Sequence, residues 1–139
     1  MKIMSDCLFC KIVAGAIPNY TVYEDDNVLA FLDIHPCSQG HTVVIPKKHF
    51  REIGEMDADS WQKLAAGLQA SVNTVQKVLQ PDAMNIGIND RPVAGQAVAH
   101  AHWHIIPRWE GDGGGSMHSI IRSREKIDVP RLAGLFQSF

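Results

Sequence analysis

The chain has 139 residues, of which 45 % are hydrophobic and 20 % charged, and this length is typical of one domain with a sizeable core. Its formal net charge of −2 argues against a protein that binds nucleic acid through excess positive charge. The sequence holds no apolar run of the roughly 20 residues that a membrane-spanning helix needs, and no apolar targeting segment precedes Cys7. We therefore expect one domain over residues 1–139, in the cytoplasm, with neither membrane nor nucleic acid as a partner.

The first third of the chain predicts a short helix followed by three strands. Residues 7–14 are typical of a short helix that ends at the Gly15 to Pro18 breaker. β-Branched and alternating segments predict strands at 21–24, 28–33 and 41–46. The turn composition of residues 25–27 indicates that the first two strands form a hairpin.

The middle of the chain predicts one long amphipathic helix over residues 57–80. Its apolar residues recur at intervals of three and four, at Trp61, Leu64, Ala65, Leu68, Val72, Val75 and Leu79. Asp57 or Asp59 can cap its start, and Pro81 prevents its continuation. We interpret the apolar stripe as core and assign it no chemistry.

Two further strands are predicted after the helix, at residues 83–89 and 96–108. In the first of them, Met84, Ile86 and Ile88 should face the core, while the alternate residues face a polar surface. Short connections between strands favour an antiparallel sheet, and a single long helix would then cover one of its faces. The fold class is therefore α+β.

Three histidines stand at every second position of the last predicted strand. Successive side chains of a strand point to opposite faces, so His100, His102 and His104 should line one face over about 13 Å. Ala101, Trp103 and Ile105 would then point into the core. A strand with such an apolar reverse side belongs to the interior, which argues against three merely solvated histidines.

Three functions are compatible with this row of imidazoles. The middle ring, His102, can act as a nucleophile on phosphorus, because a neutral imidazole is a competent attacking group near pH 7. Alternatively, the three rings can hold a zinc ion that activates water. A third possibility is a nucleotide-binding module without catalysis.

A metal site is indicated by Cys7 and Cys10, which have the Cys-x-x-Cys spacing of zinc ligands. A tetrahedral site needs two more ligands, and histidines are the candidates. His49 follows the third strand, and His100 is the member of the histidine row whose use leaves His102 and His104 available. A closed site of this kind stabilises a fold and does not activate water.

Four segments resemble the histidine triad (HIT) superfamily. They are CLFCKIV from Cys7, FLDI from Phe31, GHTVVIPKKH from Gly40, and GQAVAHAHWHIIPR from Gly95, which contains the family motif His-φ-His-φ-His-φ-φ at 100–106. The chain is most similar to the zinc-binding bacterial-type branch that resembles the nucleoside phosphoramidate hydrolases. The resemblance implies a five-stranded antiparallel sheet with one long helix and a short N-terminal helix, and a homodimer whose sheets join.

The resemblance also implies the roles of the histidines and cysteines. His102 would attack the α-phosphate and carry the nucleotide as a covalent adduct. His104 would contact the phosphate or the departing group, and His41 would orient the rings. His100 would belong both to the catalytic row and to the zinc ligands, which would be Cys7, Cys10, His49 and His100.

The same resemblance implies a purine-nucleotide substrate of the AMP or GMP type. The purine would lie among Leu8, Phe9, Ile12, Phe31 and Ile34. Asp33 would bind the ribose, and the phosphate would contact Asn89, Gln96, Ala97, His102 and His104. The activity would be hydrolysis or nucleotidyl transfer at the α-phosphate, with a dinucleoside polyphosphate as the alternative substrate.

Position 97 departs from the family pattern. The branch commonly has a serine hydroxyl near the leaving group, whereas this chain has Ala97. Alanine keeps the backbone N–H but lacks the hydroxyl proton. Because general acids commonly contribute 10²–10⁴-fold to rate, expulsion of the leaving group would depend more heavily on His104.

Overall fold

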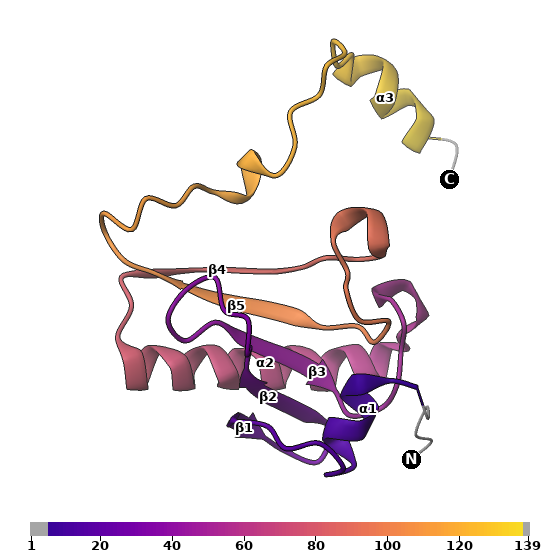
Figure 1. The fold of residues 1–139 in the computed structure, drawn as a ribbon. Coiled ribbons are helices and arrows are strands. Elements are labelled where there is room, and N and C mark those ends of the chain that lie inside the picture. Colours follow the sequence, from indigo (N-terminus) through magenta and orange to yellow (C-terminus); the bar gives the residue numbers. More distant parts are fainter. Residues whose placement is uncertain (1–5, 138–139) are drawn as a thin grey trace.

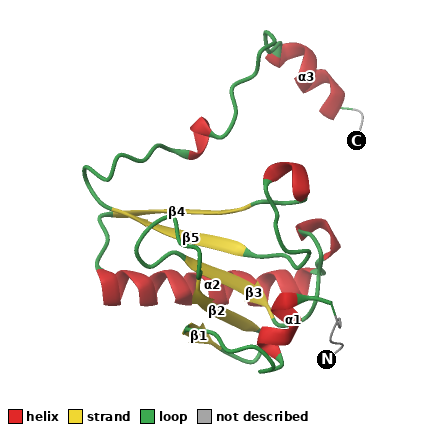
Figure 2. Cartoon of the chain, in the orientation of Figure 1, coloured by secondary structure: helices red, strands yellow, loops and turns green. Residues whose placement is uncertain are grey.

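The computed structural model describes residues 6–137, which form one antiparallel sheet of five strands in the order β1-β2-β3-β5-β4 (Figure 1). The strands are β1 (Thr21–Glu24), β2 (Val28–Leu32), β3 (Thr42–Pro46), β4 (Ala83–Ile88) and β5 (Trp103–Arg108). The helices are α1 (Leu8–Val13), α2 (Ala58–Leu79) and α3 (Val129–Phe136). Short 3₁₀ turns occur at Ile53–Glu55, Pro92–Ala94 and Met117–Ser119. The predicted α+β class and its five-stranded antiparallel sheet are confirmed (Figure 2).

The long helix α2 begins and ends as its sequence predicts. The Asp57 carboxylate accepts a hydrogen bond from the Ser60 backbone N–H at 3.1 Å and caps the first turn. Gln80 adopts the left-handed conformation that closes many helices, and Pro81 follows. The side of α2 that is buried carries Leu64, Gly67, Ser71 and Val75.

The two faces of the sheet have separate cores. On the α2 face, Val28, Ala30, Val44, Leu64, Val75, Ala101, Trp103 and Ile105 pack together with Phe50. On the opposite face, α1 covers the sheet with a second cluster of Cys7, Phe9, Cys10, Ile12, Leu29, Phe31, Val43 and Ile45. The predicted inward orientation of Ala101, Trp103 and Ile105 is confirmed, because all three lie in the first cluster. The histidine row therefore faces the α1 side.

The predicted strand at 96–108 is too long. The strand β5 begins at Trp103, and only His104 of the three histidines lies within it. The segment before it turns instead, with the His100 N–H bonded to the Val98 carbonyl and the Ala101 N–H to the Phe50 carbonyl. Alternation of polar and apolar residues cannot reveal this turn, since Ala101 packs in the α2-side core and His100 and His102 lie against Phe9 of α1 although these three residues precede the strand.

The edge strand β4 projects past the helix that covers the rest of the α2 face. The helix packs mainly against β1, β2 and β3 and contacts β5 only slightly. Met84 and Ile88 pack against the core as predicted. Ile86 was expected to face the core too, but its side chain is 39 % exposed, because α2 does not extend over this edge.

A C-terminal arm, residues 116–137, leaves the body after β5 and carries α3 at its far end (Figure 1). Every residue of the arm is exposed. The Asp128 side chain caps α3 by accepting a hydrogen bond from the Arg131 N–H. None of the helices in residues 6–137 is long and apolar enough to cross a membrane.

Gly67 gives a test of the packing between α2 and the sheet. A Cβ at this position would lie 2.7 Å from the side chain of Val28, so the helix or the strand would have to move. We expect Gly67→Ala to lower the free energy of unfolding by about 1–3 kcal/mol, as overpacking of a core usually does. Urea unfolding followed by circular dichroism measures this change.

The matched control is Gly134→Ala in α3, where a Cβ would meet nothing within 4 Å. This variant should unfold at the same urea concentration as the parent or slightly higher, because alanine favours helix. Equal unfolding midpoints for the two variants would contradict the close approach of α2 to β2.

Candidate functional site

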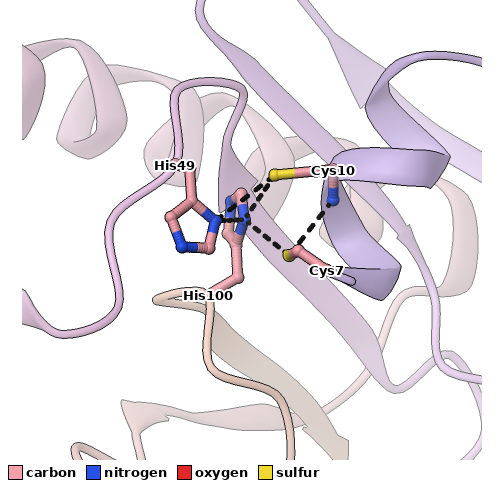
Figure 3. A group of neighbouring side chains, drawn as sticks. All are labelled: Cys7, Cys10, His49 and His100. Carbon is pink, nitrogen blue, oxygen red and sulfur yellow. Dashed lines mark hydrogen bonds between the residues drawn. The ribbon is translucent and has the colours of Figure 1, made fainter. Parts of the chain in front are cut away.

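Four side chains from three distant parts of the chain converge beside α1 (Figure 3). Cys7 and Cys10 come from the start of α1, His49 follows β3, and His100 precedes β5. The Cys7 Sγ lies 3.4 Å from His100 Nδ1, and the Cys10 Sγ lies 3.3 Å from His49 Nδ1. The two Nδ1 atoms are 3.1 Å apart. The structure thus brings together all four residues that the sequence predicts as metal ligands.

The spacing of these atoms fits a tetrahedral metal site. Typical Zn–S and Zn–N bonds with tetrahedral angles place ligand atoms roughly 3.3–3.8 Å from one another. The donor distances in the cluster run from 3.1 to 3.6 Å. Two sulfurs and two imidazoles form a donor set that suits zinc. The cluster can therefore hold a metal without rearrangement of the backbone.

His100 is oriented for this cluster by a hydrogen bond on its other ring nitrogen. Its Nε2 lies 2.8 Å from the Pro46 carbonyl oxygen, so Nε2 carries the proton and Nδ1 presents its lone pair to the sulfurs. The side chain is fully buried, and burial lowers the pKa of His100 to about 4. The ring is therefore neutral at pH 7, as metal ligation requires.

His102 is oriented in the opposite sense. Its Nδ1 lies 2.8 Å from the His100 carbonyl oxygen and must donate the proton to it. The Nε2 atom of the neutral ring consequently keeps a free lone pair. Burial lowers the pKa of His102, which keeps the ring unprotonated near neutral pH, and its side chain is only 5 % exposed.

His41 and His104 form a hydrogen-bonded pair beside His102. The Cys37 backbone N–H donates to His41 Nδ1 at 3.2 Å, so the proton of the neutral His41 ring is on Nε2. This Nε2–H points to His104 Nδ1 at 2.8 Å. His104 therefore carries its own proton on Nε2, and this buried N–H has no partner within residues 6–137.

Asp33 is the anionic group nearest to these rings. Its Oδ2 lies 3.6 Å from His41 Nε2, while its Oδ1 accepts a hydrogen bond from the His35 N–H. The charge of Asp33 raises the pKa of His41, but burial outweighs it and the net pKa is lowered. The site thus holds neutral histidines next to one carboxylate.

The Phe9 ring of α1 packs against the buried histidines and is itself contacted by Phe31 of β2. The Phe9 ring lies 5.1 Å from that of His102 and 5.5 Å from that of Phe31, both in edge-to-face geometry. Phe9, Ile12 and Phe31 are buried in the α1-side core. Leu8 and Ile34, which were also expected at the base-binding surface, are 44 % and 73 % exposed.

Three of the five expected phosphate contacts, Asn89, Gln96 and Ala97, lie on or beside the loop between β4 and β5. Asn89 is half-buried and lines a cavity that also reaches His41 and His104. Gln96 uses its amide within the loop, since its Oε1 accepts from the Arg91 N–H and its Nε2 donates to the Arg51 and Val98 carbonyls. Ala97 is exposed.

That cavity, of about 970 Å³, extends from His104 along β4 and β5 to the start of the C-terminal arm. Arg108 stands at its floor and donates hydrogen bonds to Asn85 and, through two nitrogens, to Asp112. We did not single out Arg108, Asn85 or Asp112 from the sequence. Arg108 lies on the same face as the histidines because every second residue of a strand faces the same way. Its partners could not be predicted in this way, since Asn85 is on the neighbouring strand β4 and Asp112 is in the loop after β5.

The protonation of His104 gives a test of this buried network. Burial, together with the neighbouring rings of His102 and His41, lowers the pKa of His104 to about 4. As the pH falls below about 6.5, the unfolded chain binds a proton at this residue that the folded chain does not bind until about pH 4. Stability contributed by the neutral ring is therefore lost as the pH falls through this interval.

In His104→Gln, the decrease in unfolding free energy between pH 7 and pH 5 should be smaller than in the parent by about 1 kcal/mol, after allowance for solvent screening. Urea unfolding at each pH provides the measurement. His118→Gln is the control, because His118 is exposed. Identical pH dependence in all three proteins would mean that His104 is not held neutral by burial.

Comparison with known proteins places the fold and the histidine row in a family. An uncharacterized HIT-like protein of Methanocaldococcus jannaschii is 51 % identical over 107 residues, which are 77 % of this chain and 82 % of that protein. The adenylylsulfatase HINT3 of Arabidopsis thaliana is 36 % identical over 126 residues, which are 91 % of this chain and 64 % of that protein.

A solved structure extends the likeness to three dimensions. The crystal structure of SMU.412c from Streptococcus mutans UA159 has a TM-score of 0.84 at 44 % identity, and the match covers 97 % of this chain and 83 % of that one. The family model described as HIT domain matches residues 14–111, which include the whole sheet, α2 and the histidine row. This chain therefore belongs to the HIT domain family.

Proposed function

We propose that this protein is a nucleotide hydrolase or nucleotidyl transferase in which His102 attacks the α-phosphate of a purine nucleotide. The observation that supports it most directly is the hydrogen bond from His102 Nδ1 to the His100 carbonyl. This bond reserves the lone pair of Nε2 for an electrophile. A buried, neutral imidazole whose ring lies 5.0 Å from that of His104, a residue that lines the cavity, is a suitable nucleophile for phosphorus.

In the first step, His102 Nε2 forms a bond to the α-phosphorus and the bond from phosphorus to the leaving group breaks. The leaving group departs with the bonding electron pair and takes up a proton. His104 Nε2–H is the donor that the site offers for this purpose, either to a phosphate oxygen or to the leaving atom, and removal of such a donor commonly slows a reaction 10²–10³-fold.

In the second step, water attacks the same phosphorus and the bond to His102 Nε2 breaks. The nucleoside monophosphate leaves, the His102 ring regains the neutral form with its proton on Nδ1, and the proton that the water loses replaces the one that His104 gave up in the first step. Transfer to another acceptor in place of water would give nucleotidyl transfer. Division of one displacement into two lowers the individual barriers.

The substrate class is a purine nucleotide with a leaving group on its α-phosphate, such as an amine, a second nucleotide or sulfate. The Arabidopsis relative, which is named an adenylylsulfatase, supports an adenylyl substrate. Phe9, Ile12 and Phe31 provide an apolar surface for a purine next to Asp33, which can accept hydrogen bonds from ribose hydroxyls. Asn89 and the backbone at Gln96 and Ala97 are the proposed phosphate contacts.

A metal-activated water held by the three histidines is less well supported. The ring nitrogens of His100 and His102 are bonded in opposite senses, one to Pro46 and the other to the His100 carbonyl. Within residues 6–137, the three rings do not form a group of converging ligand atoms. A dinucleoside polyphosphate remains the alternative substrate, and a non-catalytic nucleotide-binding module remains the alternative function.

We propose that Cys7, Cys10, His49 and His100 bind Zn²⁺ as a structural ion. All four tetrahedral positions are filled by protein atoms, so this ion would join α1 to β3 and β5 and would not contact substrate. Its chemistry is limited to stabilisation. The ion would add a bond between α1 and the two histidine segments, which already contact each other through the Ala101 N–H and the Phe50 carbonyl.

The zinc proposal predicts a difference between two cysteines. Cys7→Ser should weaken zinc binding by roughly 100-fold or more and lower the unfolding temperature, because a metal ligand is lost and changes to residues that only hydrogen-bond to ligands already cost about 10–100-fold. Competition with a chromogenic chelator measures the affinity. Cys37→Ser is the matched control, since Cys37 is exposed and outside the cluster. The same zinc affinity in both variants would rule out this site.

We propose further that residues 1–139 form a single domain that assembles as a homodimer in the cytoplasm. The free edge of β4 supports the dimer, because an exposed edge strand can pair with a second copy. Two sheets joined at this edge would form one continuous sheet.

The central test is His102→Asn. Turnover of an adenosine phosphoramidate should fall by at least about 10³-fold, while nucleotide binding and zinc content stay near those of the parent. Rapid quench of the parent with a slowly reacting substrate, followed by peptide mapping, should locate the nucleotidyl group on His102. The control His118→Asn should keep full activity. Normal turnover by His102→Asn, or an adduct elsewhere, would overturn the proposed mechanism.

A further inference from the structure

We propose that the salt bridge between Arg91 and Glu52 holds the loop of residues 89–97 in the position that it needs for contact with the α-phosphate. This inference rests on the proposed function, which assigns phosphate contacts to this loop, and it adds the pair of side chains that keeps the loop in place. Arg91 is a positioning residue in this proposal, because it acts through the loop and does not touch the substrate.

Arg91 has a backbone conformation that residues with a side chain rarely adopt. Its φ is 76° and its ψ is 158°, a region that is open to glycine and strained for other residues. Within residues 6–137, the other non-glycine residue with a positive φ is Gln80, which has the ordinary left-handed conformation at the end of α2. A conformation like that of Arg91 persists only where the surrounding contacts enforce it, and such residues cluster at functional sites.

The segment of residues 50–53 is bonded to the segment of residues 90–101 at four successive positions. The partners run in antiparallel order, with Phe50 bonded to Ala101, Arg51 to Gln96, Glu52 to Arg91 and Ile53 to Asp90. Phe50 is buried in the core on the α2 face, and Ile53 packs against that core. The loop is therefore fastened to a segment that is itself fixed.

Glu52 and Arg91 make the one contact of this series that joins two side chains. Arg91 Nε and Nη2 lie 3.0 and 2.9 Å from the two carboxylate oxygens of Glu52, the paired geometry that favours a specific orientation. At the backbone, the Arg91 N–H donates to Gln96 Oε1 at 2.7 Å, and the Arg91 carbonyl accepts from the Gln96 N–H at 3.3 Å. Arg91 thus connects the fixed segment to Gln96, one of the proposed phosphate contacts.

The salt bridge adds little to the stability of the fold. The Arg91 side chain is largely exposed, and exposed ion pairs contribute little to the free energy of unfolding. For stability alone, glycine would suit the φ of position 91 better than arginine. The strained arginine therefore points to a requirement of the loop and not of the fold.

The loop is next to the reacting histidines. Asn89 lines the cavity that His104 also lines, and a Cβ on Gly95 would lie 3.5 Å from the Asn89 side-chain nitrogen, so the two ends of the loop lie close together. Backbone and amide donors stabilise a transition state only if they are already aimed at the phosphate oxygens. A displacement of about 1 Å can slow a reaction roughly 100-fold, even when it originates away from the reacting atoms.

The variant Arg91→Gly separates the position of the loop from the stability of the fold. Glycine relieves the strain and removes the guanidinium, so the urea midpoint should equal that of the parent or be higher. We expect kcat for an adenosine phosphoramidate to fall about 10–100-fold and KM to change less than about threefold, because aimed donors act mainly in the transition state. Hydrogen–deuterium exchange of residues 89–97 should be faster.

The variant Glu52→Gln removes the anionic partner and leaves residue 91 unchanged. It should lose as much kcat as Arg91→Gly, and the double variant should lose no more than either single variant, as expected for two residues that act as a unit. The exchanged pair Glu52→Arg/Arg91→Glu should be at least about five times as active as Glu52→Arg alone, because it restores a pair of opposite charges. A merely structural role would not give this recovery.

The matched control is Lys63→Gln, which breaks an exposed ion pair of 2.8 Å with Asp59 on α2, outside the loop. Its kcat and its hydrogen exchange should equal those of the parent. Parent-like kcat in Arg91→Gly and Glu52→Gln, with or without faster exchange of the loop, would overturn the positioning role and leave the mechanism at His102 intact. A parent chain that does not turn over the phosphoramidate would instead overturn the proposed function, and the positioning role with it.

Discussion

The hydrogen bond between His102 Nδ1 and the His100 carbonyl is the contact on which the proposed chemistry depends. It connects a ring to the backbone only two residues earlier, so it is set by the local turn before β5. With this bond in place, the only lone pair of the neutral ring is on Nε2. Phe9 then packs against the ring and limits its rotation. Without the turn, a row of histidines would have no preferred nucleophilic nitrogen.

In the neighbouring rings of His41 and His104, hydrogen bonds also fix which nitrogen carries the proton. The Cys37 N–H donates to His41, and His41 donates to His104. The Nε2–H of His104 is the last donor in this series and has no partner within the described residues. Burial lowers the pKa values of His41, His102 and His104, so the rings stay neutral and the order of donors is preserved. A phosphate oxygen would complete this chain of hydrogen bonds.

The sequence predicts the parts of the molecule that depend on periodicity. The spacing of Leu64 and Val75 identifies α2, and the alternation of Ala101, Trp103 and Ile105 identifies the core side of the histidine segment. Cys7 and Cys10 point to the metal cluster through their spacing. Periodicity cannot predict the turn before Trp103, because side chains alternate there without strand pairing. It also cannot predict the exposure of Ile86, which depends on how far α2 extends across the sheet.

The path of the C-terminal arm and the network around Arg108 depend on tertiary geometry. The outward path of residues 116–137 follows from an anchor that joins β4, β5 and a loop, and no local pattern encodes such an anchor. The apolar spacing of Leu132 and Phe136 and the Asp128 cap could have identified α3. They would not have indicated that the helix lies away from its own body.

The side chain and the main chain of His100 have different partners. The imidazole serves the cysteine cluster, whereas the carbonyl oxygen serves His102. Any amino acid at position 100 supplies a carbonyl, so loss of the metal ligands need not disturb the attacking nitrogen. A descendant could therefore lose the proposed zinc site, with compensation elsewhere in α1, and retain the proposed reaction.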